Sequence, residues 1–189
     1  MKNRIVTVSR EFGSGGRTIA RKAADLIGIP CYDQEIITNL AKESKFTEDF
    51  VSAEIENVHS TWFAGFTTGM PTPSDTIWVT QCKVIKELAE KGSCIIVGRC
   101  ADYILRGLHG CLNVFIHADY DFRAKRISEV YGENEVPTIR RLKEKDKSRA
   151  AYYLNYTDET WGLLRNYDVT LNSGVLGIDK CAEVIRSLY

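Results

Sequence analysis

The sequence predicts an α/β fold in which helices flank a doubly wound, mainly parallel sheet. The continuously apolar run at residues 94–98, and the similar run at residues 112–117, are typical of strands buried on both faces. Helical patterns of apolar residues separate such runs, and this alternation is characteristic of a parallel sheet. The chain has 189 residues, of which 44% are hydrophobic, enough for one domain with a sizeable core. We therefore expect residues 1–189 to form a single domain.

The first strand and first helix are joined by a glycine-rich loop. A β-branched run at residues 6–8 precedes three glycines within four residues, and a helical pattern at residues 17–27 follows. Such a loop directs backbone N–H groups and the positive end of a helix at one point, which favours an anion. The alternative is a strand-to-helix turn without a ligand. The predicted phosphate-binding residues are Gly13, Ser14, Gly15, Gly16, Arg17 and Thr18.

The loop departs from the Walker A pattern, G-x-x-x-x-G-K-S/T, which fits here in two registers. With Gly15 as the second glycine, the lysine position holds Gly16. With Gly16 as the second glycine, that position holds Arg17, followed by Thr18. Neither register contains lysine, although the second retains a cation and a hydroxyl. Arg17 is thus the nearest candidate to replace the lysine.

The helix at residues 17–27 is expected to end at Gly28, and residues 29–32 are long enough only for a brief strand. Asp33 follows this strand and is a plausible N-cap for a helix at residues 34–41. Ligands of open parallel sheets bind at the edge where the strands end. Asp33 is therefore a candidate substrate-binding residue, with the cap alone as the alternative.

Residues 42–74 are predicted to form a flap inserted in the domain, which begins as an acidic helix-like segment. Its part at residues 58–73 contains Trp62, Phe63 and Phe66. These rings are suited to stacking on a base, to packing on a second copy in a homo-oligomer, or to anchoring the loop on its own core. The sequence leaves these alternatives open.

Beyond the flap, the pattern of alternating elements continues to the end of the chain. We expect helices at residues 75–91, 119–131 and 178–188, and strands at residues 94–98, 112–117 and 168–171. Two basic helical segments flank residues 132–137, so a basic lid is expected at about residues 127–150. For its lysines, a solvated charged face is the favoured alternative.

Three further arginines are candidate phosphate ligands. One follows a predicted strand, and two lie on the helix before the lid. Arg99 follows the strand at residues 94–98, where its side chain is expected to project toward the glycine-rich loop. Arginine at such a site binds phosphate with two parallel hydrogen bonds, although pairing with a surface carboxylate is the alternative. Arg123 and Arg126 are three residues apart and share a helix face. We include both with Arg17 as candidate catalytic cations.

Charge and cysteine content exclude several classes of partner. The 25 basic and 25 acidic residues cancel, which argues against a nucleic acid polymer or an anionic membrane. No apolar run approaches the roughly 20 residues of a membrane span, and no room precedes the first strand for a signal peptide. The six cysteines form no C-x-x-C pair, so we expect reduced thiols, no bound metal and a cytoplasmic protein.

Several segments together resemble the cytidylate kinase-like branch of the P-loop nucleoside monophosphate kinases. They are the glycine-rich loop, Tyr32-Asp33, Gly98-Arg99, residues 117–126, residues 146–149 and residues 171–173. The resemblance implies ATP as phosphoryl donor, a nucleoside monophosphate as acceptor, and Mg²⁺ held mainly through phosphates and water. By position, Arg99, Asp146 and Arg149 match acceptor-binding residues, while Arg123 and Arg126 match the helix leading into the lid.

The chain also departs from that family pattern. The resemblance favours the register that leaves Gly16 in the lysine position. Cys100 stands where true cytidylate kinases have an aspartate that helps to select cytosine, and Leu142 and Asn39 stand where arginines are expected. The pattern therefore supports phosphate binding but not cytosine selection.

The expected function is phosphoryl transfer from ATP to a small-molecule acceptor, with a nucleoside monophosphate as the favoured acceptor. This chemistry needs alignment and electrostatic stabilisation rather than a covalent nucleophile. Since the loop lacks lysine, a catalytically weak or inactive nucleotide-binding regulator is the alternative. A protein that acts only through contacts of the flap is a third possibility.

Overall fold

The computed structural model describes residues 4–43, 73–132 and 137–189. The aromatic part of the predicted flap, residues 58–73, lies almost entirely outside this range. The proposed roles of Trp62, Phe63 and Phe66 therefore remain predictions. The described segments contain every strand expected from the sequence.

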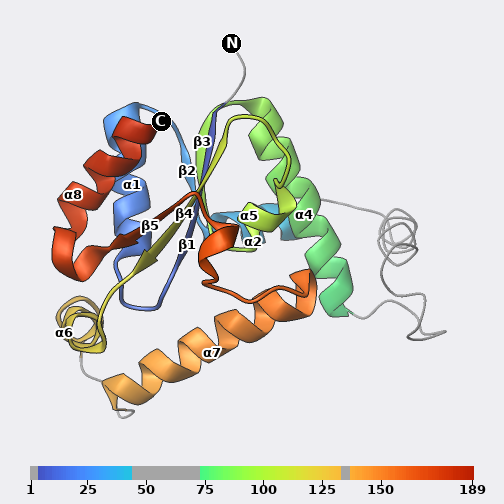
Figure 1. Cartoon of the computed structure of the whole chain (residues 1–189). Helices are drawn as coiled ribbons and strands as arrows, with labels where there is room; N and C mark the ends of the chain where they lie inside the picture. Colours follow the sequence, from blue (N-terminus) through green and yellow to red (C-terminus); the bar gives the residue numbers. More distant parts are fainter. Residues whose placement is uncertain (1–3, 44–72, 133–136) are drawn as a thin grey trace.

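The five strands are all parallel and lie in the order β2-β3-β1-β4-β5 (Figure 1). The central strand β1 pairs with β3 on one side and β4 on the other, so Val8 lies beside Val97 and Val114. This arrangement confirms the predicted doubly wound sheet. The strands are β1 (Ile5–Arg10), β2 (Cys31–Tyr32), β3 (Cys94–Val97), β4 (Cys111–His117) and β5 (Val169–Asn172).

Helices cover both faces of the sheet. Figure 1 shows α1 and α8 on one face, α2, α4 and α5 on the other, and α7 running past the end of the sheet where β1 finishes. The helices are α1 (Gly16–Ile27), α2 (Gln34–Glu43), α4 (Pro73–Lys91), α5 (Ala101–Ile104), α6 (Tyr120–Tyr131), α7 (Thr138–Thr157) and α8 (Ser173–Leu188), with a 3₁₀ turn at Leu164–Asn166.

Helix α1 shows how local sequence sets its bounds. Ile19, Ala20 and Ala23 recur at helical spacing and are completely buried against the sheet. At the end of the helix, Gly28 adopts φ 80° and its N–H binds the carbonyl of Ala24. A left-handed residue at this place ends a helix at little cost only when it is glycine. The expected end at Gly28 is therefore confirmed.

Two apolar cores lie on opposite faces of the sheet. The core beneath α1 and α8 includes Val6, Val8 and Ile185, and the core beneath α2 and α4 includes Ile5 and Ile85. Successive side chains of β1 thus alternate between the two cores, as a strand covered on both faces requires. The central position of β1 also fixes where the loop that follows it lies.

The structure differs from the expected elements mainly near the C-terminus. Helix α8 begins at Ser173, five residues before the expected start, and Gly177 interrupts it with φ 76° and ψ 164°. Asn172 caps this helix, since its side chain accepts hydrogen bonds from Gly174 and Val175 N–H. The short helix α5 was not predicted because four residues are too few for a helical apolar repeat.

Candidate functional site

A cavity of about 460 Å³ lies where β1 and β3 end, between the glycine-rich loop, α2, α6 and α7. Its position is the one at which open parallel sheets bind ligands, since neighbouring connections there diverge to opposite faces. The lining residues are Arg10, Glu11, Phe12, Gly13, Gly15, Gly16, Arg17, Thr18, Asp33, Gln34, Glu35, Thr38, Asn39, Arg99, Arg126, Tyr131 and Arg149.

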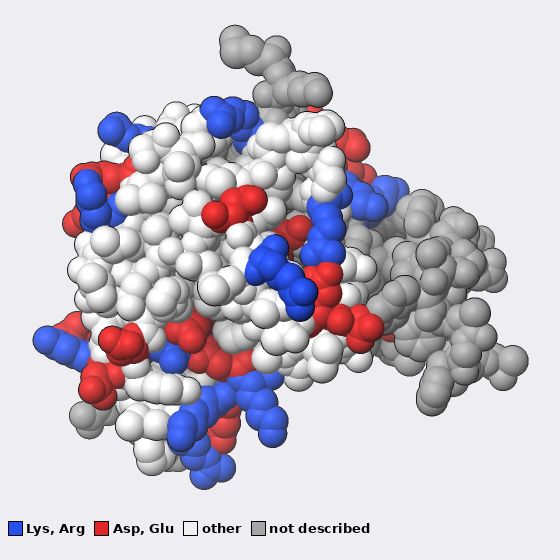
Figure 2. All heavy atoms as spheres, viewed as in Figure 1, with Lys and Arg blue, Asp and Glu red and all other residues white. Residues whose placement is uncertain are grey.

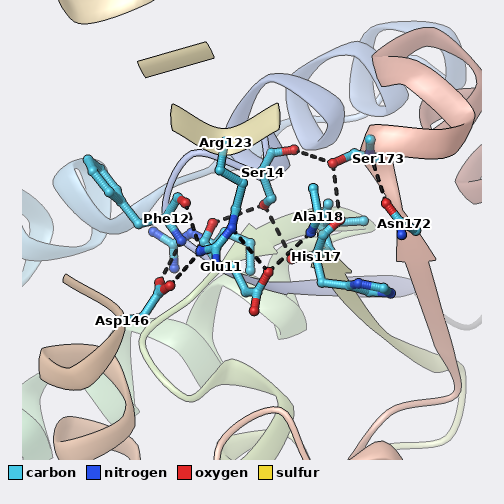
Figure 3. A network of polar contacts seen from close by, with 12 residues as sticks. Glu11, Phe12, Ser14, His117, Ala118, Arg123, Asp146, Asn172 and Ser173 are labelled. Atoms are coloured by element: carbon cyan, nitrogen blue, oxygen red, sulfur yellow. Dashed lines mark hydrogen bonds and ion pairs between the residues drawn. The ribbon is translucent and has the colours of Figure 1, made fainter. Parts of the chain in front are cut away.

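The glycine-rich loop is held in place by polar contacts from distant strands (Figure 3). The Ser14 hydroxyl lies 2.9 Å from the Glu11 carbonyl and 3.2 Å from that of Ile116. The Ser173 hydroxyl donates to the Ser14 carbonyl at 2.6 Å. Ser14 is fully buried, so of the predicted loop residues it alone does not line the cavity. Its side chain supports the loop from behind.

The first turn of α1 faces the cavity, as the sequence predicts. Gly15 has φ 80° and immediately precedes the helix, which begins at Gly16. The first N–H groups of a helix have no partner within that helix, and the helix dipole adds positive potential there. Arg126 reaches this end of α1 and donates to the Thr18 hydroxyl at 2.9 Å. This part of the cavity is therefore suited to an anion.

Arg17 and Asp33 form an ion pair at the cavity edge. The Arg17 guanidinium lies 2.6 Å from the Asp33 carboxylate and 3.2 Å from that of Glu35. The other Asp33 oxygen accepts hydrogen bonds from Glu35 and Ile36 N–H, which confirms Asp33 as the cap of α2. Burial disfavours the charged carboxylate, but the Ile36 N–H and Arg17 outweigh it and lower the pKa of Asp33. The charge of Arg17 is thus already balanced.

Arg123 and Asp146 lie behind the loop, not in the cavity (Figure 3). Arg123 donates to Asp146 at 2.5 Å and to the Phe12 carbonyl at 3.2 Å, and its side chain is only 3% exposed. Asp146 accepts a hydrogen bond from Phe12 N–H at 2.7 Å. Both side chains therefore hold the loop backbone, and neither lines the cavity. The catalytic role expected of Arg123 and the acceptor-binding role expected of Asp146 remain predictions.

Arg99 and Arg149 line the cavity on the side away from α1. Arg99 donates to the Thr38 hydroxyl at 3.2 Å, and its buried Nε has no hydrogen-bond partner in the described part of the chain. Arg149 donates to the Arg10 carbonyl at 3.0 Å. Burial lowers the pKa of Arg149, against the opposing effect of Asp146. Arg149 has one carboxylate contact, Asp146 at 4.0 Å, and both predicted residues present cationic groups to the cavity.

Arg10 is a cation of the lining that the sequence did not single out. It is the last residue of β1, and its guanidinium packs against Gly98. Burial, followed by the nearby Arg149 and Arg99 guanidinium groups, lowers the pKa of Arg10. The Walker A pattern could have pointed to Arg10. In the register that places Gly16 at the lysine position, Arg10 occupies the position of the first glycine.

The lysines of α7 point into solvent. Lys143, Lys145 and Lys147 are exposed, and Arg140 bonds to Glu144 at 2.8 Å on the same surface. Figure 2 shows Lys and Arg side chains gathered over the lower edge of the molecule, where Figure 1 places α7, with acidic groups beside them. These lysines therefore form a solvated charged face, which was the favoured alternative for them. Arg149, on the same helix, lines the cavity.

Cys100 does not face the cavity. It adopts φ 55°, is 4% exposed and packs with Trp78, Val79 and Tyr153. Burial raises the pKa of its thiol. All six cysteines are unpaired, and no three metal-ligating His, Cys, Asp or Glu side chains cluster within the described ranges.

A second hollow, of about 650 Å³, lies between α5 and residues 158–168. Its best-placed cation, Arg106, forms two hydrogen bonds with Glu159, at 2.5 and 2.7 Å. The charges of Arg106 and Glu159 are therefore paired with each other. The smaller cavity, with its arginines and the end of α1, is the better candidate site.

A glycine-rich loop between the central β1 and α1, in a parallel sheet of this order, defines the fold of P-loop kinases. Two solved structures share it: a shikimate kinase from Acinetobacter baumannii (TM-score 0.52, 14% identity) and a gluconokinase from Sinorhizobium meliloti (TM-score 0.56, 14% identity). The alignments cover 98% and 99% of this chain and 92% and 93% of the respective structures. The chain itself belongs to the cytidylate kinase-like family, whose model matches residues 5–175.

Two relatives extend over nearly the whole chain. A cytidylate kinase from Methanopyrus kandleri is 23% identical over 197 residues, covering 97% of this chain and 91% of the relative. An uncharacterized protein of known structure from Eubacterium ventriosum is 29% identical with a TM-score of 0.76, covering 98% and 97% of the two chains. Together these findings support a nucleotide or small-molecule kinase. None of the helices in the described ranges is long and apolar enough to span a membrane.

Proposed function

We propose that this protein transfers the terminal phosphoryl group of ATP to a small-molecule acceptor, and that the acceptor is a nucleoside monophosphate. The observation that carries this proposal is the convergence of the α1 N-terminus with Arg10, Arg99 and Arg149 on one cavity. A triphosphate and a second phosphate bring several negative charges, which this set of cations and N–H groups would offset. Membership of the family supports the same activity.

The proposed reaction requires no covalent nucleophile from the protein. An oxygen of the acceptor phosphate forms a bond to the γ-phosphorus of ATP while the bond from that phosphorus to the bridging oxygen breaks. The bridging oxygen keeps the electron pair and leaves as part of ADP. The protein contributes alignment of the two substrates and stabilisation of the charge on the transferred group.

The two substrates would occupy opposite sides of the cavity. We assign the ATP phosphates to the N–H groups of the loop and α1, with Thr18 and Arg126 beside them. We assign the acceptor phosphate to Arg99 and Arg149. Asp33 takes part only by holding Arg17 and α2 in place, because its carboxylate oxygens are already bonded.

Magnesium would arrive with the phosphates of ATP. Mg²⁺ prefers oxygen ligands and usually retains several waters, so it does not require a cage of protein carboxylates. When bound, it would neutralise charge on the phosphates being separated. The residues near the loop fit this mode, since the Thr18 hydroxyl lines the cavity. We place this reaction in the cytoplasm, where ATP, nucleoside monophosphates and reduced thiols occur together.

A screen of ATP consumption tests the proposal. Purified protein with MgATP is given CMP, UMP, AMP, GMP, shikimate or gluconate, and ADP formation is followed in each. A mock purification from the same host without the gene controls for contaminating kinases. Formation of a nucleoside diphosphate from at least one monophosphate is expected.

One feature favours a second function, namely glycine at the lysine position of the loop. A nucleotide-binding regulator would bind ATP without consuming it. Saturable ATP binding with no ADP formed from any acceptor would establish that alternative in place of the kinase. Absence of both binding and turnover would exclude both functions.

A further inference from the structure

Compared with a regular Walker A loop, this chain has a cation where the first glycine is expected and glycine where the lysine is expected. In the register with Gly15 as the second glycine, the pattern calls for glycine at position 10 and lysine at position 16. This chain has arginine at the first and glycine at the second. A long cationic side chain is therefore present in the motif, but it originates at the opposite end of the loop.

The structure shows why these two positions are linked. A Cβ atom on Gly16 would lie 2.5 Å from Cβ and 2.8 Å from Cγ of Arg10. These distances are shorter than side-chain atoms tolerate, and the stem of Arg10 near its own backbone has little freedom to move. The Arg10 stem thus fills the space into which a side chain at position 16 would extend. Only one of the two positions can carry a long side chain.

The far end of Arg10 is accommodated by a second glycine. Gly98, which follows β3, has φ 77°, and a Cβ there would lie 2.1 Å from Nη1 of Arg10. The guanidinium therefore extends from the loop to the end of the neighbouring strand. This position lies between the proposed ATP phosphates at α1 and Arg99, which directly follows Gly98 on the proposed acceptor side.

No ion pair balances the charge of Arg10 in the described structure, and the opposing effect of Asp33 on the pKa of Arg10 is smaller than the effects of Arg149 and Arg99. Among the described residues, no carboxylate lies within 4.0 Å of its guanidinium, in contrast to Arg17, which contacts Asp33 and Glu35. Among charged groups, the guanidinium groups of Arg149 and Arg99 have the largest effect on the pKa of Arg10, and both lower it. Arginine retains its proton even in such surroundings, so this cluster is stabilised by binding an anion.

We infer that Arg10 takes the place of the Walker lysine and binds the phosphoryl group during its transfer between ATP and the acceptor. This inference rests on the proposed kinase function and assigns a residue to it. Arg10 presents a planar fork to the phosphate oxygens, where lysine would present a point charge. Gly16 is then glycine because it leaves room for the Arg10 stem, whereas the φ of 77° at Gly98 favours glycine by itself.

The first test compares Arg10→Ala with Arg17→Ala. Loss of a catalytic arginine lowers phosphoryl transfer by about 10³-fold or more, so Arg10→Ala should lose at least that much turnover. Its affinity for MgATP, measured by calorimetry, should fall about tenfold or more, as expected when a charged hydrogen bond is lost. Arg17→Ala should lose at least tenfold less turnover than Arg10→Ala. Arg186→Ala on the outer surface of α8 is the matched control, and melting temperatures verify folding.

The second test uses the steric link between the two positions. Gly16→Ala removes no charge but should reduce turnover and MgATP affinity, whereas Gly92→Ala, which has open space around it, should change neither. The double variant Arg10→Gly with Gly16→Lys restores the first glycine and the lysine of the motif, with Arg17 still in the Ser/Thr position, and should be at least tenfold more active than Arg10→Gly alone. If Arg10→Ala does not fold, Arg10→Lys replaces it and should lose tenfold or more in turnover, because the fork is lost.

Three results would each overturn the assignment. The first is a folded Arg10→Ala variant whose turnover and MgATP affinity stay near those of the wild type. The others are an Arg17→Ala variant that loses as much turnover as Arg10→Ala, and a double variant that is no more active than Arg10→Gly alone. If the wild type consumes no ATP with any acceptor, the kinase proposal fails on its own, and the effect of Arg10→Ala on MgATP affinity still decides the role of Arg10. If the wild type is active and Arg10→Ala is equally active, only the assignment of Arg10 fails.

Discussion

The Asp146 carboxylate on α7 accepts the backbone N–H of Phe12 at 2.7 Å and binds the buried Arg123 guanidinium at 2.5 Å. One side chain thus joins the glycine-rich loop, α6 and α7. The Arg123 side chain is 3% exposed, and its other carboxylate contact, Glu11, is longer at 3.5 Å, so removing Asp146 leaves this charge poorly compensated and away from water. Asp146→Ala should therefore lower the free energy of unfolding by about 3 kcal/mol, measured by urea denaturation.

A second ion pair on the same helix provides the control for this prediction. Glu144 bonds to Arg140 in a pair whose side chains are 56% and 72% exposed. Glu144→Ala should change the free energy of unfolding by less than about 0.5 kcal/mol, since water compensates exposed charges. Equal effects of the two variants would show that Asp146 is not the link between these elements.

Gly15 is expected to be essential for ATP binding, and Gly28 offers a matched comparison. Both have φ 80°, at opposite ends of α1, so alanine introduces similar backbone strain of about 1–2 kcal/mol at each. A Cβ at Gly15 would lie 2.4 Å from Ile178 Cδ1 and 3.0 Å from Arg126 Nε, whereas nothing lies within 4 Å at Gly28. Gly15→Ala should therefore lose MgATP affinity in calorimetry while Gly28→Ala keeps it. Equal affinities would remove the loop from the proposed site.

Cytosine should not be strongly preferred among acceptors. A carboxylate that accepts hydrogen bonds from the base contributes about 1.5–3 kcal/mol, and Cys100 provides none. The ratio of kcat/KM for CMP to that for UMP, AMP or GMP should therefore stay within about tenfold. A preference for CMP above about a hundredfold would show that another residue reads cytosine.

Restoring the missing carboxylate should not restore that preference. Cys100 is buried against Trp78, Val79 and Tyr153 and does not line the cavity. Cys100→Asp would bury a carboxylate among apolar groups and should lower the melting temperature well below that of Cys100→Ser. A stable Cys100→Asp variant that gains selectivity for CMP would contradict the buried position of this side chain.

The buried Asp102 should make stability depend on pH. Burial raises the pKa of this carboxyl, although hydrogen bonds from Tyr153 at 2.7 Å and Ser9 at 3.4 Å oppose the shift. The folded state therefore holds the proton more tightly than the unfolded state, whose Asp pKa is about 3.9. The contribution of Asp102 to stability is present below that pH and is lost as the pH rises through the folded pKa.

Asp102→Asn removes this titration and retains an acceptor for Tyr153. The free energy of unfolding of the wild type minus that of Asp102→Asn should decrease between about pH 4 and pH 8, measured by urea denaturation. Asp121→Asn, at an exposed position on α6, serves as the control. A difference that is constant over this range would show that Asp102 has the same proton affinity in both states.

Local features could be predicted because their causes lie within a few residues. The end of α1 follows from Gly28 alone, and the cap of α2 follows from Asp33 and the two N–H groups that come next. The central strands are recognisable because both of their faces meet apolar cores, so most of their residues are apolar. Arg99 also falls where a strand end must place it, at the edge that holds the cavity.

The roles of the arginines required the tertiary structure. Arg10, Arg17, Arg99, Arg123 and Arg149 all lie in or near family motifs, and the sequence offers no means to tell a paired cation from an available one. Arg17 is balanced by Asp33, sixteen residues away, and Arg123 by Asp146, twenty-three residues away. Arg10 depends on the absence of side chains at Gly16 and Gly98.

The sequence by itself determined the sheet, the glycine-rich loop and the family, because strand burial, helix ends and motif spacing depend on residues that are close together in the chain. Tertiary structure alone decided which cations face the cavity and which support the loop from behind. The physical reason is that charge balance and steric exclusion depend on distances between atoms from different elements. Those distances exist only once β1, β3, α6 and α7 have packed together.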